Sequence, residues 1–465
     1  MGGVAAACRQ MGDEVFGSEP DLYEPMKSYL AGLGVEVRPE FNADAMVAAR
    51  PDFVVVGNAV SRGNPELEAA MNRRMPMVSL PQLVRERLIG QKTSVVVAGT
   101  HGKTTTTAML AWILEVAGFT PGFLIGGVPG NFDVSCRPAA GEVFVSEGDE
   151  YDSAFFDKRS KFIHYRPDVV ILNNLEFDHS DIFDSLADVK RSFRHFVRLV
   201  PGGGTILSLA GDANLEDVLA TDAHAPVMLF GLEAGDWHAT EVVESSSGVQ
   251  FALRGPGGSE QITLPMPGRY NALNAVAAAA GAVTLGAPLE VVRTALATFR
   301  PPKRRLEIKG DWRGVTLVED FAHHPTAIKQ AIGALRAMFP GRRLWVAFEP
   351  RSNTTTRNVF QTELTEALAL ADGVFLGALD RPHRYTADER LDTERLVQEL
   401  ARRGVAGWSV PLDAGPDWGD LVLTRIEAEV GPGDVLAVLT NGDFGGLRRA
   451  LAERTAPIAA VHTSH

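Results

Sequence analysis

Short runs of apolar residues alternate along the chain with longer stretches in which apolar residues recur every three or four positions. The short runs are typical of strands buried in a parallel sheet, and the longer stretches are typical of amphipathic helices. This alternation predicts βαβ units and therefore an α/β fold. It extends over most of the 465 residues, which at roughly 150 residues per domain indicates about three domains.

Residues 1–92 form the first predicted segment, in which one strand stands out. Phe53–Val56 is a continuous apolar run. A Rossmann-like unit begins with a strand and a glycine-rich turn before its first helix, whereas here a helical pattern starts almost at Met1. We therefore expect a Rossmann-like domain without its first strand, and Met1 as an internal methionine of a longer natural product. Weaker patterns predict a strand at Glu14–Gly17 and helices at Val4–Met11, Pro25–Ala31 and Pro81–Ile89.

Residues 93–300 form the second predicted segment, which opens with the uninterrupted apolar run Ser94–Ala98. A glycine-rich turn and a predicted helix, Lys103–Ala117, follow it. This order predicts a central P-loop ATPase-type parallel sheet. The further elements expected are strands at Glu142–Val145 and Val169–Leu172, hairpins between residues 225 and 265 with a turn at Ser245–Gly248, and an alanine-rich helix at Asn271–Leu285.

Residues 301–465 form the third predicted segment. It begins at Pro301-Pro302, because consecutive prolines break any regular element. Strands again alternate with helical patterns, which predicts a second doubly wound, Rossmann-like sheet. The strands expected are Val315–Val318, Leu344–Phe348, Val374–Leu376 and Val435–Leu439.

Composition and charge limit the kinds of partner that the protein is expected to bind. The net charge of −13 argues against general affinity for nucleic acid, which needs a concentrated basic face. No apolar run approaches the roughly 18 to 20 residues needed to cross a bilayer. The two cysteines, Cys8 and Cys136, cannot form a disulfide framework and fit a reducing cytosol. We therefore expect a cytoplasmic protein that acts on small molecules, without a nucleic-acid or membrane partner.

The turn after the strand Ser94–Ala98 has the chemistry of a phosphate cradle. Backbone N–H groups and the dipole of the following helix attract an anion, while Lys103 would meet the β and γ phosphates and Thr104 would ligate Mg²⁺. The general Walker pattern requires a glycine where Val97 stands, so it fails by one position. The alternative is a chance Gly-Lys-Thr at a helix start with threonine as an ordinary cap. The candidate nucleotide-binding residues are Gly99, Thr100, His101, Gly102, Lys103, Thr104 and Thr105.

Two polar segments follow later strands of the same predicted sheet. Ser146–Asp152 carries four carboxylates, and Asn173–His179 ends in Asp178 and a histidine. Because the carboxyl ends of parallel strands lie at one edge of a sheet, these side chains could face a nucleotide and hold Mg²⁺ through hard oxygen ligands. Read alone, an acidic loop is more often simply solvated, and a lone histidine is usually structural.

With these neighbours, the loop Gly99–Thr105 resembles the ATP loop of the Mur ligase family, in which the shorter glycine spacing is usual. The resemblance implies ATP and Mg²⁺ as cofactors, with Glu147 and His179 as magnesium ligands beside Thr104. The motif Gly268–Asn274 is similar to one whose asparagine, here Asn271, is expected to touch adenine. The alternative role for Asn271 is a helix cap.

The third segment supplies further candidates for the same reaction. Arg305 can stabilise charge on a transferred phosphoryl group, and Asp320 at a strand end can hold ribose hydroxyls. His323 or His324 could orient substrate near the reaction centre, with Lys103 and His179 as the other catalytic candidates. A metal site at the two histidines is disfavoured, because no thiol or third ligand is placed for it in the sequence.

Within the family, three stretches are most similar to members that join L-alanyl-γ-D-glutamyl-meso-diaminopimelate to UDP-N-acetylmuramate: Gly126–Phe132, Phe155–Phe162 and Glu349–Thr354. The resemblance implies an acyl phosphate intermediate and closure of the last segment on binding. An L-alanine ligase and a non-catalytic nucleotide switch remain the alternatives. The substrate-binding residues implied are Ser18, Asn58 and Asn64 for the UDP sugar, and Arg351, Ser352 and Asn353 for the peptide.

Overall fold

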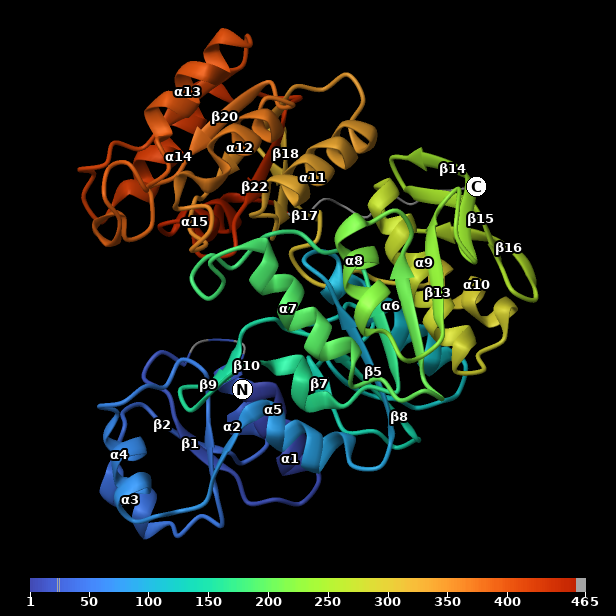
Figure 1. Ribbon diagram of the computed structural model, residues 1–465. Helices are drawn as coiled ribbons and strands as arrows, with labels where there is room; N and C mark the ends of the chain where they lie inside the picture. The colour runs from blue at the N-terminus through green and yellow to red at the C-terminus, as the bar shows by residue number, and fades with distance from the viewer. Residues whose placement is uncertain (23, 25, 457–465) are drawn as a thin grey trace.

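The computed structural model describes residues 1–22, 24 and 26–456. The chain forms an α/β protein whose parts follow one another in Figure 1 from blue through green and yellow to red. Within the described residues, strands gather in five sheets, of which the largest has ten strands and the second largest six. The predicted α/β fold on parallel-rich sheets is confirmed. Domain boundaries at residues 92 and 300 stay predictions.

The first segment holds two separate pairs of parallel strands. The predicted apolar strand is present, and the predicted strand Glu14–Gly17 is shifted toward Ser18. The helix expected from Pro25 begins, within the described residues, at Met26, because Pro25 itself lies outside them. The elements are α1 (Gly2–Gln10), β1 (Phe16–Ser18), α2 (Met26–Gly32), β2 (Glu36–Arg38), α3 (Ala43–Ala48), β3 (Val54–Val56), α4 (Pro65–Asn72), β4 (Met77–Ser79), α5 (Leu80–Leu83) and the π-helical turn η1 (Val84–Ile89).

The ten-stranded sheet is built around β5 (Thr93–Ala98), which pairs in parallel with β8 (Val143–Glu147) and β11 (Val169–Leu172). Successive side chains of β5 point to opposite faces, as the pleat requires. Val95 and Val97 pack with α6 (Lys103–Val116), α9 (Arg269–Thr284) and α10 (Leu289–Ala297). Val96 and Ala98 pack with α7 (Leu186–Val197), α8 (Ala213–Asp222), η2 (Lys161–Tyr165) and helices of the first segment. Both faces of the strand are buried, which explains its continuous apolar run.

The outer strands of this sheet correct one prediction. Hairpins were expected over residues 225–265, but β13 (Val227–Leu232) runs parallel to β12 (Thr205–Leu209) and belongs to the parallel part. Antiparallel pairing begins only with β14 (Trp237–Ser245) and β15 (Gly248–Gly255), which are joined at the expected turn. The remaining strands are β16 (Gly258–Leu264), β6 (Gly122–Leu124) and β7 (Cys136–Arg137), beside the small pair β9 (Asp152–Ala154) and β10 (Asp157–Ser160).

The third segment forms a doubly wound sheet, as predicted, and its strands lie in the order β17-β18-β22-β19-β20-β21. All neighbouring strands are parallel except the hairpin β17–β18. Helices cover both faces of the sheet, so alternate residues of β19 pack into two different hydrophobic cores. The strands are β17 (Glu307–Trp312), β18 (Val315–Asp320), β19 (Leu344–Phe348), β20 (Gly373–Leu376), β21 (Ala406–Ser409) and β22 (Val435–Leu439). The helices are α11 (Pro325–Met338), α12 (Gln361–Leu368), α13 (Thr393–Arg402), α14 (Trp418–Glu429) and α15 (Leu447–Arg454), with 3₁₀ turns η3 (Asn358–Phe360) and η4 (Pro382–Arg384).

Among the helices of residues 1–22 and 26–456, none is both long enough and apolar enough to cross a bilayer.

Candidate active site

The candidate site lies where three adjacent parallel strands end. The loops that follow β5, β8 and β11 leave the sheet at the same edge, because these strands are parallel neighbours. The three polar motifs of the central segment are therefore brought together, although they are separated by tens of residues along the chain. The carboxyl edge of an open α/β sheet is the usual place for a ligand.

The loop between β5 and α6 depends on two glycines. Gly99 and Gly102 both have positive φ, at 132° and 79°. A side chain at Gly99 would place its Cβ 2.8 Å from the carbonyl oxygen of Asn174, in the loop that follows β11. The backbone N–H of Thr100 donates to that same carbonyl at 3.1 Å. The shape of the loop is therefore fixed by its close approach to a neighbouring backbone.

Gly99→Ala is expected to lower the free energy of unfolding by about 1–3 kcal/mol, because both the backbone conformation and the Cβ contact are unfavourable. Urea unfolding measures the loss. The matched control is Gly118→Ala, since Gly118 also has positive φ, 83°, but a Cβ there would meet no atom within 4 Å. Equal losses in the two variants would show that the approach to Asn174 carries no cost of its own.

Lys103, the first residue of α6, is held by a buried carboxylate. Its Nζ donates to Glu150 Oε2 at 2.9 Å and to the carbonyl of Gly99 at 2.6 Å. Glu150 is 3% exposed. Burial alone would lower the pKa of Lys103, but the hydrogen bond and charge of Glu150, together with the charges of Glu147 and Asp149, outweigh burial and raise it. The pairing of Lys103 with Glu150, rather than with one of its acidic neighbours, was not predicted.

Thr104 and Glu147 form a cluster of hard oxygens beside this lysine. Thr104 Oγ1 donates to Glu147 Oε1 at 2.9 Å, and the backbone N–H of Gly126 donates to Glu147 Oε2 at 2.7 Å. Arg305 reaches across from the third segment, and its Nη2 donates to Thr104 Oγ1 at 3.2 Å. A hydroxyl and a carboxylate at a helix N-terminus fit the ligand preference of Mg²⁺.

His179 lies on the Lys103 side of the site. Its Nε2 is 3.9 Å from Glu150 Oε2, and its ring centroid is 4.5 Å from that of Tyr151. His179 has a positive φ of 56°, which is uncommon for a residue other than glycine. Such backbone conformations are often found at functional sites. The structure thus places this predicted metal ligand in one cluster of polar and charged side chains with Lys103 and Glu150.

Two candidates for nucleotide contacts are fully engaged with their own chain. Asp320 accepts hydrogen bonds from the backbone N–H groups of Leu306 and Ala322, both at 2.7 Å, and burial raises its pKa. Asn271 donates to the carbonyl of Pro267 at 2.6 Å and accepts from Asn274. The alternative role of Asn271 as a helix cap is wrong, because α9 begins at Arg269 with Gly268 as its cap.

The histidines of the third segment lie at the start of α11. His323 is packed beside Phe321, whose carbonyl oxygen is 3.0 Å from its Nδ1, and burial lowers the pKa of its imidazole. His324 caps α11 by accepting from the backbone N–H of Thr326. A metal site at these histidines was disfavoured because no third ligand was expected near them. The fold corrects that assumption, because it brings His101 and Glu176 to His324.

The predicted substrate residues fall into two groups. In the first segment Ser18 donates to Glu66 Oε1 at 2.6 Å, while Asn64 caps α4 and Asn58 is exposed. Ser18 and Asn64 therefore have local structural partners. In the third segment Arg351, Ser352 and Asn353 follow β19. Of these, Asn353 reaches the central segment, where its Nδ2 donates to Asp181 Oδ2 at 2.8 Å.

A buried hydrogen bond that was not predicted from the sequence joins the central and third segments. Thr354 Oγ1 donates to Asp178 Oδ1 at 2.8 Å, and Arg357 donates to the carbonyl of Ser180 at 3.1 Å. Burial alone would raise the pKa of Asp178, but the nearby histidines His179, His323 and His324 lower it far below its usual range. The loop after β11 is thus both part of the site and the docking surface for the third segment.

Models of three protein domain families match successive parts of the chain. Residues 1–91 match "Mur ligase family, catalytic domain", residues 97–282 match "Mur ligase middle domain", and residues 304–442 match "Mur ligase, glutamate ligase domain". These matches take in nearly all of the residues discussed above.

Individual relatives separate into two named activities. The chain is 41% identical over 456 residues to UDP-N-acetylmuramate–L-alanyl-γ-D-glutamyl-meso-2,6-diaminoheptandioate ligase from Escherichia coli, covering 97% of this chain and 95% of the relative. It is 32% identical to UDP-N-acetylmuramate–L-alanine ligase from Geobacter sp., covering 95% and 92%.

The same two activities are found among similar solved structures. A murein peptide ligase from Psychrobacter arcticus matches with a TM-score of 0.73 at 33% identity, covering 99% of this chain and 97% of that one. UDP-N-acetylmuramate-alanine ligase from Thermotoga maritima matches with a TM-score of 0.77 at 25% identity, covering 98% and 96%. The fold is therefore common to both activities, and the higher sequence identities lie on the side of the peptide ligases.

Proposed function

The chain belongs to the Mur ligase family, and we propose that it is the ATP-dependent ligase that joins L-alanyl-γ-D-glutamyl-meso-diaminopimelate to UDP-N-acetylmuramate. The observation that carries this proposal is the 41% identity to the Escherichia coli ligase of that specificity over 97% of the chain. The L-alanine ligase is the second candidate, because the Thermotoga structure has the slightly higher TM-score. Sequence identity decides between them, since the backbone fold is shared.

The chemistry requires an activated carboxylate. A carboxylate resists attack by an amine, so the γ-phosphoryl of ATP is transferred to the lactoyl carboxylate of UDP-N-acetylmuramate to give an acyl phosphate and ADP. The amine of the peptide's alanine then attacks the acyl carbon, an amide bond forms, and inorganic phosphate leaves. Formation of one C–N bond is thus coupled to cleavage of one phosphoanhydride bond.

The residues of the central edge fit the first step. Lys103 presents an ammonium at the start of α6, where backbone N–H groups also face an anion. Thr104 and Glu147 would hold Mg²⁺, with His179 as the candidate for a second ion, and the metal would neutralise charge on phosphate oxygens. Arg305 adds a guanidinium from the third segment, 3.2 Å from Thr104 Oγ1. Charge that develops on the transferred phosphoryl group is therefore met from two segments.

The remaining sites are assigned by their position. Arg351 to Asn353 would meet the peptide, whose carboxylates an arginine can bind bidentately. The UDP sugar would be bound by Ser18, Asn58 and Asn64, and the adenine by Asn271. Asp320 would hold the ribose or position the segment that carries Arg305. His323, half-buried beside Phe321, would orient the substrate near the acyl carbon. A cytoplasmic location, where ATP is supplied, is part of the same proposal.

Phosphate release measured with UDP-N-acetylmuramate and ATP tests the proposal. We expect release to depend on the tripeptide, with a kcat/KM at least about 10²-fold above that for L-alanine, because a site built for the longer substrate discriminates through contacts that alanine cannot make. Release with L-alanine alone would support the second candidate. Nucleotide binding without release in any mixture would indicate a nucleotide switch.

A further inference from the structure

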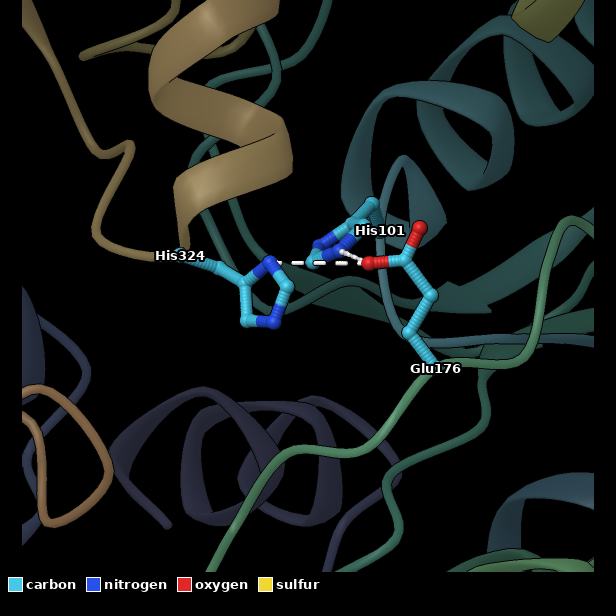
Figure 2. Close-up of side chains that lie close together, drawn as sticks. All are labelled: His101, Glu176 and His324. Atoms are coloured by element: carbon cyan, nitrogen blue, oxygen red, sulfur yellow. Dashed lines mark hydrogen bonds and ion pairs between the residues drawn. The ribbon is translucent and has the colours of Figure 1, made fainter. Parts of the chain in front are cut away.

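Three side chains meet at the boundary between the central and third segments, beside the proposed phosphate site. His101 comes from the loop before α6, Glu176 from the loop after β11, and His324 from the start of α11; Figure 2 shows all three converging. His101 Nε2 lies 3.2 Å from Glu176 Oε2, and His324 Nδ1 lies 3.6 Å from the same oxygen. From the sequence, His101 was predicted only as part of the nucleotide loop, and no role was predicted for Glu176.

The spacing suits a tetrahedral metal ion. One ligand atom from each residue lies within 4.8 Å of the others. A tetrahedral Zn²⁺ with imidazole nitrogens at about 2.0–2.1 Å separates its ligand atoms by about 3.3 Å. Two of the three separations already have nearly this length. The set of two histidines and one glutamate leaves a fourth position for water, as in zinc sites with three protein ligands.

The hydrogen bonds of His324 fix which of its ring nitrogens carries the proton. Its Nε2 is 3.3 Å from the carbonyl of Phe177, which can only accept, so Nε2 carries the proton. Its Nδ1 accepts from the backbone N–H of Thr326 and is therefore unprotonated. A histidine that donates its other ring N–H to a carbonyl is the usual arrangement around a bound metal. Burial lowers the pKa of His324 to about 4, in keeping with a neutral ring.

Glu176 supplies the oxygen that lies between the two histidines. Its Oε2 is 3.2 Å from His101 Nε2 and accepts from Thr326 Oγ1 at 2.7 Å. His324 Nδ1, which carries no proton, lies 3.6 Å from the same oxygen. An unprotonated imidazole nitrogen and a carboxylate oxygen are both metal ligands, so a cation between them could bind both.

We propose that His101, Glu176 and His324 bind a divalent transition ion of the Zn²⁺ or Co²⁺ class and that this ion ties α11 to the central segment. Imidazole ligands favour such ions over Mg²⁺, which prefers oxygen. The site is distinct from the oxygen cluster of Thr104 and Glu147, and it needs no assumption about the ligase reaction. Because one ligand belongs to the third segment and two belong to the central segment, the ion stabilises their docking.

Cobalt binding to the full, metal-stripped protein tests the proposal. The titration is made with Co²⁺ in saturating Mg²⁺ and ADP, which occupy the nucleotide site, and is followed by the visible absorption of four-coordinate Co²⁺. We expect one tight Co²⁺ per chain. His324→Asn should weaken it by at least about 10²-fold, because an imidazole ligand is lost, while asparagine retains the N-cap of α11. His383→Asn, at an exposed histidine in η4, is the matched control and should bind as the unmodified protein does.

Glu176→Gln provides a second variant and should weaken Co²⁺ binding similarly, because it removes the anionic ligand. Circular dichroism and urea unfolding check that each variant is folded; if His324→Asn is not, Glu176→Gln decides. Failure of the unmodified protein to bind Co²⁺ in excess Mg²⁺, or unchanged binding in a folded ligand variant, would overturn the proposal. Since the readout is metal binding, a negative result leaves the proposed ligase activity untouched, and a failed phosphate-release assay leaves this site untouched.

Discussion

Replacing Lys103 with methionine is expected to lower kcat by about 10³-fold, because the ammonium at the start of α6 is the main fixed positive charge of the phosphate loop. The same change is expected to lower the free energy of unfolding by about 3–5 kcal/mol. The reason is Glu150, which is 3% exposed and pairs with Lys103 Nζ at 2.9 Å. Without the lysine a buried carboxylate loses its counter-charge.

The double variant Lys103→Met/Glu150→Gln separates these two effects. Glutamine has the size of glutamate but no charge, so most of the lost stability should return, whereas kcat should stay low. Urea unfolding gives the first quantity, and phosphate release at saturating substrates gives the second. If the double variant regained turnover along with stability, the role of Lys103 would be structural only.

The parallel strands of the two large sheets could be predicted from the sequence because their burial on both faces leaves a continuous apolar run. β5, β11, β19 and β22 all appear where that signal predicts them. The first segment was harder, since its strands have only three residues each and are not all buried. β13 was misassigned for a related reason. Several of its side chains are partly or fully exposed, and its pattern resembles that of the hairpin beside it.

The phosphate loop could be predicted because all its residues are contiguous. Glu147 and His179 were predicted only through their place after strands and a family resemblance. The pairing of Lys103 with Glu150 spans 47 positions, and that of Asp178 with Thr354 spans 176. Which of several neighbouring carboxylates meets a distant partner depends on the exact path of two loops, which neither periodicity nor spacing encodes. The cluster of His101, Glu176 and His324 was missed for the same reason.

Arg305→Ala is expected to lower kcat by about 10²–10³-fold, with the affinity for ATP changed much less. Arg305 reaches Thr104 Oγ1 from the third segment, so its charge is presented to the phosphate loop only when that segment is docked. An interaction of this kind acts on the transition state rather than on the first encounter with nucleotide. Phosphate release gives kcat, and equilibrium ADP binding gives the affinity of the loop.

Arg305→Lys sharpens the test, because lysine keeps the positive charge but lacks the planar guanidinium. A partial recovery of kcat would show that the positive charge is what matters. No recovery would show that the planar geometry of the guanidinium, which also lies over the ring of Phe321, is required. Arg293→Ala is the matched control, since Arg293 is an exposed arginine of α10 paired with Glu260. An unchanged kcat in Arg305→Ala would mean that the contact with Thr104 only docks the third segment, and the phosphoryl group would then be stabilised from the central segment alone.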